Sequence, residues 1–366
     1  MTDLEIKKVG EIFGIEGEYR SFTQIKSGNI NQTYLVKYHR NGGNKRYIIQ
    51  KLNTFVFKNP EQVMNNIDAV TEHIREKIKE TGESAKRAVL HFLHGPDGKS
   101  FAYDESGGFW RGYRYIDDSV TYDESNDLFV IEQAGIGFGN FQKYLADFDA
   151  SKLFDSIPDF HNTEKRFDRL FEVAAQDPFG RLKDVKNELK YLEDHRELSL
   201  SLCKMLQNGE LPLRVTHNDT KINNVVFDYH TDQSLAVIDL DTVMPGLCAY
   251  DFGDAIRFGA NDTAEDDPDL SKINLNLDKY EAYTRGFIGT IRDSITKKEL
   301  ETMYLGAYVM TVELVARFML DYLEGDVYFK LNYPEHNLIR TRAQDALARN
   351  MESKLDKMEN IVARYY

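Results

Sequence analysis

The most informative part of this chain is THNDTKINNVVFD (216–228), followed after a short turn by LAVIDLD (235–241). Asp219 and Asn224 are five residues apart, and the apolar run of the second segment ends at Asp239, twenty residues after Asp219. A positioned carboxylate can take the proton of a hydroxyl group, and carboxylate and amide oxygens are good ligands for Mg²⁺. The set therefore predicts phosphoryl transfer to a hydroxyl, a reaction that needs such a base and such a metal site together.

The spacing from Asp219 to Asn224 equals that between the catalytic Asp and the metal-binding Asn of protein kinases. We therefore predict that Asp219 is the base, and that Asn224 and Asp239 hold Mg²⁺. Asp and Asn also shape turns and cap helices, so the prediction depends on the ordered set and not on one residue. Asp241 is predicted to share a strand face with Asp239, which leaves it as an alternative or additional metal ligand.

The letters Asp251-Phe252-Gly253 match the metal motif of protein kinases. They open the helical pattern DFGDAIRFGA, however, and do not directly follow an apolar strand. We predict a helix here, with Asp251 as its cap or as a brace for the loop of Asp219. His217 is predicted to order that loop, because Asp219 already fills the position of the base.

The first 116 residues have the pattern of an antiparallel sheet with one inserted helix. The predicted elements are a hairpin over 33–52, a helix that starts at Pro60, and strands at 87–94, 100–104 and 108–116. Residues 117–366 are mostly helical in their periodicity, apart from a hairpin at 224–241. The fold class is therefore predicted as α+β with two lobes, 1–116 and 117–366.

Composition limits the classes of function. The chain has 366 residues, of which 42% are hydrophobic, and a formal charge of −14. This charge makes nucleic acid and anionic membranes unlikely partners in our prediction. The apolar stretch 304–323 contains Glu313, Arg317 and Asp321, which argues against a membrane span. Two cysteines exclude a disulfide framework, and the start MTDLEIKKVG lacks an apolar signal core, so we expect a cytoplasmic protein.

Seven segments together resemble the aminoglycoside phosphotransferase and choline kinase group of small-molecule kinases. They are SGNINQTYLV (27–36), RYIIQKLN (46–53), RVTHNDTKINN (214–224), VIDLDTVMPG (237–246), DFGDAIRFGA (251–260), DYLEGDVYF (321–329) and YPEHNLIRTR (333–342). The last four are most similar to the sugar-kinase branch, the N-acetylhexosamine 1-kinases. The resemblance spans nearly the whole chain and implies a two-lobed, protein-kinase-like fold with a small β-rich nucleotide-binding N-lobe and a large helical C-lobe.

The resemblance also implies an activity. It is the transfer of phosphate from ATP, with Mg²⁺, to the anomeric hydroxyl of N-acetylglucosamine or N-acetylgalactosamine, by a monomer or weak homodimer. Asp219 would contact the sugar as well as act as the base. The other residues at sugar-binding positions are Asn29, Phe258, Arg317 and Tyr328.

Two positions depart from the expected pattern, Gln50 in the nucleotide site and Asn29 in the sugar site. The residues expected to bind nucleotide are Gly28, Asn31, Thr33 and Gln50. Gln50 stands where the third strand of protein kinases provides a lysine to the phosphates, and Lys51 is predicted to point to the other face of the sheet. The family usually has a histidine where this chain has Asn29, which affects the choice between the two sugars.

Several alternatives stay open at this point. Glu313, Arg317 and Asp321 recur every four residues, so they form either an exposed ion-pair ladder or a polar stripe along a cleft. Phe258 and Tyr328 are either flat surfaces for a sugar ring or core aromatics. The acceptor of a related kinase could instead be choline, ethanolamine, methylthioribose or an aminoglycoside. The absence of a lysine at position 50 would also suit a kinase-fold protein that binds without catalysis.

Overall fold

The structure, a computed structural model, describes residues 2–25 and 30–366. Two compact units can be distinguished within it. The first contains the described residues up to Val120, together with Ser151–Ile157 and Val226–Met244. The second contains Thr121–Ala150, Pro158–Val225 and Pro245–Tyr366. Residues 226–244 thus join the first unit although they come late in the chain, and the lobe boundary predicted at residue 116 stays a prediction.

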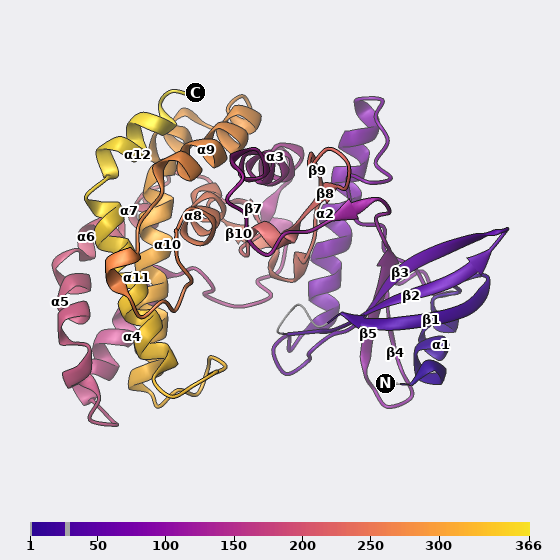
Figure 1. The fold of residues 1–366 in the computed structure, drawn as a ribbon, viewed down its shortest axis with the longest axis horizontal. Helices are drawn as coiled ribbons and strands as arrows, with labels where there is room; N and C mark the ends of the chain where they lie inside the picture. Colours follow the sequence, from indigo (N-terminus) through magenta and orange to yellow (C-terminus); the bar gives the residue numbers. More distant parts are fainter. Residues whose placement is uncertain (1, 26–29) are drawn as a thin grey trace. The chain divides into compact units, whose positions relative to one another are not determined.

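The first unit is built on a five-stranded antiparallel sheet in the order β1-β2-β3-β5-β4 (Figure 1). The strands are β1 Glu18–Ile25, β2 Gln32–Arg40, β3 Gly43–Lys51, β4 Phe101–Tyr103 and β5 Phe109–Arg114. β2 and β3 form the predicted hairpin. Asn41 and Gly42 at its turn have φ of 52° and 74°, as a tight two-residue turn requires.

Helices cover the two faces of this sheet. α1 (Asp3–Ile12) begins with a capping box of Thr2 and Glu5 and packs on one face. The buried residues of this contact are Ile6, Val9, Phe13, Tyr34, Val36, Tyr38, Ile49 and Trp110. α2 (Pro60–Glu80) is the predicted helix, and its Met64 lies 3.9 Å from Arg111 on the opposite face.

The predicted strand at 87–94 is wrong. Only Phe92 forms a bridge, to Tyr113 of β5. β4 already occupies the first half of that edge of β5, so residues 91–93 can bond only its far end. A smaller sheet in the order β6-β8-β9 completes the first unit, with β6 Ser119–Val120, β8 Val225–Asp228 and β9 Ser234–Val237.

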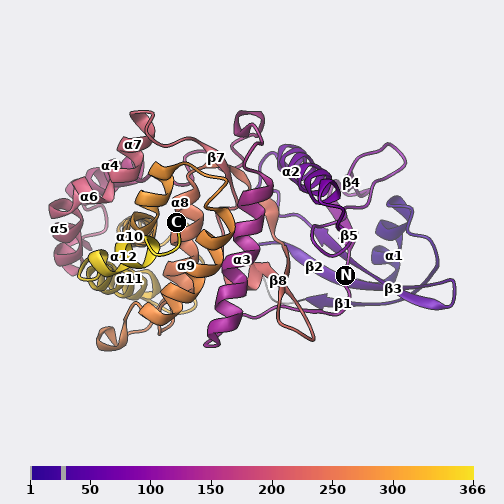
Figure 2. The ribbon, with the colours of Figure 1, turned by 90° about the horizontal axis from the view of Figure 1, so that it is seen from above.

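The second unit is helical and centred on α10 (Lys297–Leu323). By length and composition this helix could cross a membrane, but 83% of its most apolar window is buried inside the protein. α8, α11 and α12 lie beside it (Figure 2). The helices of this unit are α3 Leu128–Tyr144, α4 Thr163–Gln176, α5 Lys186–Asp194, α6 Arg196–Ser199, α7 Ser201–Gln207, α8 Cys248–Gly259, α9 Leu277–Ile291, α10, α11 His336–Glu352 and α12 Leu355–Val362.

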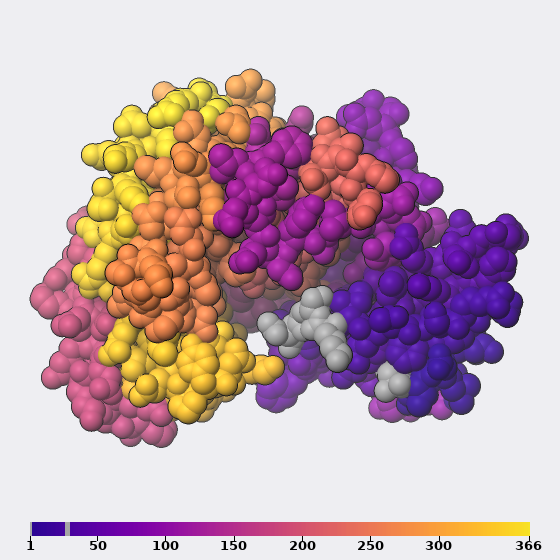
Figure 3. Space-filling model, viewed as in Figure 1, coloured from indigo at the N-terminus to yellow at the C-terminus, as the bar shows by residue number. Residues whose placement is uncertain are grey.

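Two pairs of helices approach each other closely near the site described below. A Cβ atom on Gly253 of α8 would collide with the backbone of Gly306 in α10, so these helices meet backbone to backbone. Gly135 of α3 and Gly286 of α9 make a similar contact. In the space-filling view the C-terminal residues, in yellow, lie against the orange surface of α9 (Figure 3).

Candidate functional site

The predicted base and one predicted metal ligand lie together in the second unit. The chain leaves β7 (Arg214–Thr216), passes Asp219 and enters a short 3₁₀ turn that ends at Asn224. The Asn224 amide nitrogen donates to the Asp219 backbone oxygen at 2.8 Å and to its carboxylate at 3.1 Å. The amide oxygen of Asn224 is on the other side of the same group, and it is the atom that a cation would use. We call residues 217–224 the Asp219 loop.

Asp251 of α8 braces this loop, which is one of the two roles predicted for it. Its carboxylate accepts hydrogen bonds from the backbone nitrogens of His217 and Asn218, both at 2.8 Å, and from the side chain of Gln142 at 2.7 Å. Burial raises the pKa of Asp251, although His217 and the two backbone donors oppose this shift. Asn218 has a left-handed backbone, φ 63°, and the nitrogen of the peptide that follows it donates to the His217 ring.

His217 orders the loop from inside. It is fully buried, and its ring makes edge contacts with Phe138 and Phe141, with centroids 5.4 and 5.8 Å away. Its Nδ1 accepts a hydrogen bond from the Asp219 backbone nitrogen at 3.2 Å. An accepting Nδ1 assigns the ring proton of the neutral form to Nε2. These contacts agree with the ordering role and give His217 no access to a reacting hydroxyl.

Lys221 is a residue of this loop that the sequence analysis missed. Its Nζ lies 3.0 Å from the Asp219 carboxylate and 5.8 Å from the centre of the Phe258 ring. Burial alone would lower the pKa of Lys221, but the carboxylates of Asp219 and Asp254 raise it, so the ammonium group stays charged. The available signal was a basic residue two positions after the predicted base in the same short loop.

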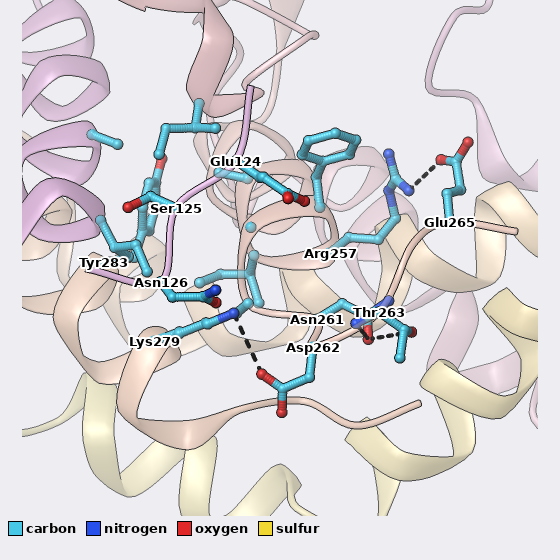
Figure 4. A pocket seen from close by; sticks show the side chains of 18 of the residues that line it. Glu124, Ser125, Asn126, Arg257, Asn261, Asp262, Thr263, Glu265, Lys279 and Tyr283 are labelled. Atoms are coloured by element: carbon cyan, nitrogen blue, oxygen red, sulfur yellow. Dashed lines mark hydrogen bonds and ion pairs between the residues drawn. The ribbon is translucent and has the colours of Figure 1, made fainter. Parts of the chain in front are cut away.

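Phe258, one of the predicted sugar contacts, is half-buried and lines a cavity of about 350 Å³ in the second unit. Figure 4 shows residues from the segment before α3, from α8 and from the loop after it: Glu124, Ser125, Asn126, Arg257, Asn261, Asp262, Thr263 and Glu265. The cations here are already paired, Arg257 with Glu265 at 2.8 Å and Lys279 with Asp262 at 3.4 Å. Asp123 and Glu124 add two more carboxylates, so the lining is acidic overall.

Arg317 lies in a second cluster, on α10. Its guanidinium is 5.2 Å from the ring centre of Phe160 and 5.7 Å from that of Phe329. Its Nε is buried and has no hydrogen-bond partner among the described residues. Glu313, one turn earlier, is fully buried and accepts from His161 and Thr163. The alternative of an exposed ion-pair ladder is therefore wrong.

Tyr328 is 67% exposed, so it is not a core aromatic. Its position is fixed through the backbone by Asp321, the third polar residue of the α10 stripe. The Asp321 carboxylate accepts from the backbone nitrogens of Val327, Tyr328 and Phe329 at 2.7–2.9 Å. Asn337 donates to the same carboxylate at 2.7 Å. The loop that presents Tyr328 is thus tied to the end of α10.

Interacting polar side chains connect the Asp219 loop with the Arg317 cluster in the second unit. Burial would raise the pKa of Asp254, but Arg257, Lys221 and His161 lower it. Burial would likewise raise the pKa of Glu313, and His161 and Arg317 lower it. A series of interacting polar side chains therefore extends from Lys221, beside Asp219, through His161 to Arg317.

The other predicted metal ligand, Asp239, lies in the first unit. The prediction that Asp239 and Asp241 share a strand face is wrong, because β9 ends at Val237 and a 3₁₀ turn starts at Leu240. Asp239 has a left-handed backbone, φ 61°, and is exposed, whereas Asp241 is 4% exposed. The turn separates the two carboxylates into different environments.

Asp241 belongs to a cluster on one face of the five-stranded sheet. Its Oδ2 accepts from Asn31 at 2.6 Å and its Oδ1 from Arg111. Arg111 Nε donates to Gln50 at 2.8 Å, and Gln50 donates in turn to Thr33 at 3.0 Å. We call these five residues the Arg111 cluster. Three predicted nucleotide-binding residues, Asn31, Thr33 and Gln50, thus lie together.

Lys51 points to the opposite face, as predicted. Its Nζ is 3.6 Å from Asp104 and 5.4 Å from the Trp110 ring. The predicted nucleotide contact Gly28 and the predicted sugar contact Asn29 lie outside the described residues.

The donor chemistry of each unit fits Mg²⁺. Within residues 2–25 and 30–366, no three His, Cys, Asp or Glu side chains gather as a metal site made by protein alone requires. Mg²⁺ in phosphoryl-transfer enzymes is held mainly by substrate phosphates and water, with one or two protein oxygens. The Asn224 amide oxygen and the exposed Asp239 carboxylate are oxygens of that kind.

Solved structures share this fold at low sequence identity. A choline kinase from Cryptosporidium parvum has a TM-score of 0.59 and 12% identity, covering 98% of this chain and 97% of its own. An aminoglycoside phosphotransferase from Alicyclobacillus acidocaldarius has a TM-score of 0.56 and 13% identity, covering 93% and 92%. Spectinomycin phosphotransferase, in complex with ADP and spectinomycin, has a TM-score of 0.53 and 12% identity, covering 96% and 99%.

The family model of the phosphotransferase enzyme family matches residues 21–284, which include most of β1, the strands β2 to β5, the Asp219 loop and α8. This match covers more than half of the chain. The α+β architecture described above is the one found in aminoglycoside phosphotransferases and choline kinases. The chain therefore belongs to the phosphotransferase enzyme family.

Proposed function

We propose that this protein is an ATP- and Mg²⁺-dependent kinase that converts N-acetylglucosamine or N-acetylgalactosamine to the sugar 1-phosphate. The observation that carries the proposal is the Asp219 loop. A carboxylate is held there at 3.1 Å by Asn224 and at 3.0 Å by Lys221, and Asp251 fixes the backbone before it. Family membership supports the phosphotransferase part, and the resemblance of the Arg317 and Tyr328 region supports the sugar.

Asp219 is the proton acceptor in this reaction. The acceptor hydroxyl oxygen forms a bond to the γ-phosphorus of ATP, the bond from that phosphorus to the bridging oxygen of ADP breaks, and the hydroxyl proton passes to Asp219. Lys221 balances the negative charge beside the reacting hydroxyl. Mg²⁺, when bound, neutralises charge on the phosphates, and Asn224 and Asp239 are the residues that would hold it.

A neutral sugar needs directed hydrogen bonds and a flat apolar surface. Arg317 has a buried Nε without a partner among the described residues, and Tyr328 presents an exposed ring on an anchored loop. Phe258 offers a ring beside Lys221, close to the base. Asn29 is proposed as a further sugar contact.

The acidic cavity beside Phe258 favours a second candidate, a kinase for a cationic acceptor such as an aminoglycoside or choline. Among the described residues, Asp123 and Glu124 have no cation partner, whereas Asp262 and Glu265 pair with Lys279 and Arg257. An ammonium group would find a favourable charge there.

A substrate panel separates the two candidates. ADP release is measured with Mg-ATP and, in turn, N-acetylglucosamine, N-acetylgalactosamine, choline and an aminoglycoside, and the product is identified by phosphorus NMR. We expect ADP release only with the two sugars and a phosphate on the anomeric oxygen. Preference for a cationic acceptor would replace the sugar assignment by the second candidate, and no acceptor-dependent release from any compound would contradict both.

A further inference from the structure

The starting point is the place of the missing lysine. In protein kinases the third strand gives a lysine that must be ion-paired for activity. Gln50 occupies this place. Its amide nitrogen donates to Thr33 and its amide oxygen accepts from Arg111. Lys51 cannot replace it, because its ammonium group lies on the opposite face with Asp104 and Trp110. A different cation must organise this face of the sheet.

Arg111 is that cation by its register. In the pairing of β3 with β5, Arg111 stands directly opposite Gln50, and Gln50 stands opposite Thr33 of β2. Directly paired residues of antiparallel strands project to the same face. Arg111 is only 2% exposed, so it acts through neighbours and not by direct contact with a ligand.

Asp241 connects Arg111 to two segments that bear predicted ligand contacts. One is Asn31, whose side chain donates to Asp241 at 2.6 Å and accepts from the Asn53 backbone at 3.0 Å. The other is the turn that begins at Asp239, because Asp241 is the second residue of the 3₁₀ turn that follows it. Both Asp241 oxygens already have donors, which disfavours Asp241 as a metal ligand.

We propose that Arg111 and Asp241 form a positioning pair that replaces the strand-three lysine pair: it orients the Asp239 turn and Asn31 for a magnesium–nucleotide complex, and Asp241 itself does not bind the metal. This inference rests on the proposed kinase function. The pair carries no net charge, so its effect is geometric. Removing the pair should weaken nucleotide binding in the presence of Mg²⁺ more than it weakens nucleotide binding without Mg²⁺.

The test measures the dissociation constant of ADP by calorimetry, with Mg²⁺ and with EDTA. Neutralising one partner alone leaves a buried charge and risks misfolding, so the main variant is the double change Arg111→Met with Asp241→Asn, which removes both charges. We expect the Mg²⁺-dependent increase in ADP affinity to be about 10–100-fold smaller in this variant, because removing residues that orient metal ligands usually has an effect of this size. Binding in EDTA should change less than about twofold, a shift of about 0.4 kcal/mol.

Two further variants make the result specific. Lys51→Met is the matched control, since it removes a cation from the neighbouring position on the other face and should keep the wild-type gain. Asp239→Asn should lose the whole gain, because it removes a proposed ligand.

Two results would overturn the inference. One is a double variant in which Mg²⁺ increases the affinity for ADP as much as it does in the wild type. The other is a single Asp241→Asn variant that loses as much as Asp239→Asn while Arg111→Lys loses nothing, because Asp241 would then be a metal ligand. Failure of the proposed function looks different: wild-type protein would bind no ADP under either condition, and the inference would fall with it.

Discussion

The Asp219 loop and the Arg111 cluster hold chemically important side chains in two different ways. In the Asp219 loop, Asp219 and Asn224 are five residues apart, and backbone hydrogen bonds to Asp251 fix the loop. In the Arg111 cluster the partners are 61 and 130 residues from Arg111. Strand pairing places Gln50 opposite Arg111, and Asp241 joins the cluster through side-chain hydrogen bonds. The first arrangement tolerates few changes of backbone, whereas the second depends on one buried ion pair.

The largest expected effect is on turnover, and it distinguishes the Asp219 loop from the Asp239 turn beside the Arg111 cluster. Asp219→Asn should lower turnover about 10²–10⁴-fold, because the hydroxyl loses its proton acceptor, while the affinity for ADP stays near wild type. Asp239→Asn should instead weaken magnesium-dependent nucleotide binding, because a carboxylate ligand becomes neutral. Steady-state kinetics together with ADP calorimetry check both variants. Near-native turnover in both would place the reaction elsewhere in the molecule.

The next prediction tests whether the hydrogen bonds to Asp251 stabilise the Asp219 loop. Asp251→Ala leaves the buried nitrogens of His217 and Asn218 without an acceptor, at about 1–3 kcal/mol each. We expect the unfolding free energy to fall by about 2–6 kcal/mol in total, with a fall in turnover, measured by urea denaturation and ADP release. Asp251→Asn is the milder control, since it keeps an acceptor oxygen. An unchanged midpoint for the alanine variant would show that the loop does not need the brace.

A smaller effect concerns the sugar cluster on α10. Arg317→Ala should reduce kcat/KM for the hexosamine by a factor that corresponds to about 1.5–3 kcal/mol, because a sugar oxygen loses a charged donor. The KM for ATP should stay near its wild-type value. Arg181→Ala is a suitable comparison, because that arginine ties Asp326 of the same loop without facing Phe160. Equal losses in both variants would mean that Arg317 only stabilises the loop.

The smallest effect probes Gln50 of the Arg111 cluster. Gln50→Ala removes one hydrogen bond to Arg111 and one to Thr33, each with a net value of about 0.5–1.5 kcal/mol. We expect the KM for ATP to rise more than the KM for the sugar. Gln50→Lys places a cation where protein kinases have one, but it also puts two cations side by side, so it should not improve on wild type. An equal, mild change in both constants would make Gln50 a structural residue only.

Local spacing was sufficient to predict several elements. The Asn41-Gly42 turn and its alternating flanks predicted β2 and β3, and the three- and four-residue spacing after Pro60 predicted α2. The spacing of Asp219 and Asn224 predicted that they serve one site, and in the structure the two side chains are in hydrogen-bond contact. These features depend on interactions between residues that are close in the chain, so the residue types and their spacing are sufficient to predict them.

Other features were decided by tertiary structure. The segment 87–94 has the composition of a strand, but β4 occupies the edge of β5 that it would need. The end of β9 at Val237 separates Asp239 from Asp241, although an alternating pattern placed them on one face. Composition and periodicity describe what a segment prefers, not which edge is still available for pairing.

By itself, the sequence determined the α+β class, and it predicted the loop of Asp219 with Asp251 as a helix cap or as its brace. It did not determine that Arg111 would stand opposite Gln50, or that Asp241 would meet Arg111, because these pairings follow from strand register and from a turn far along the chain. The register between β3 and β5, which no tight turn connects, depends on the hydrophobic patterns of both strands together, and no single stretch of sequence contains both. Only the folded sheet brings the cation, the amide and the carboxylate of this cluster together.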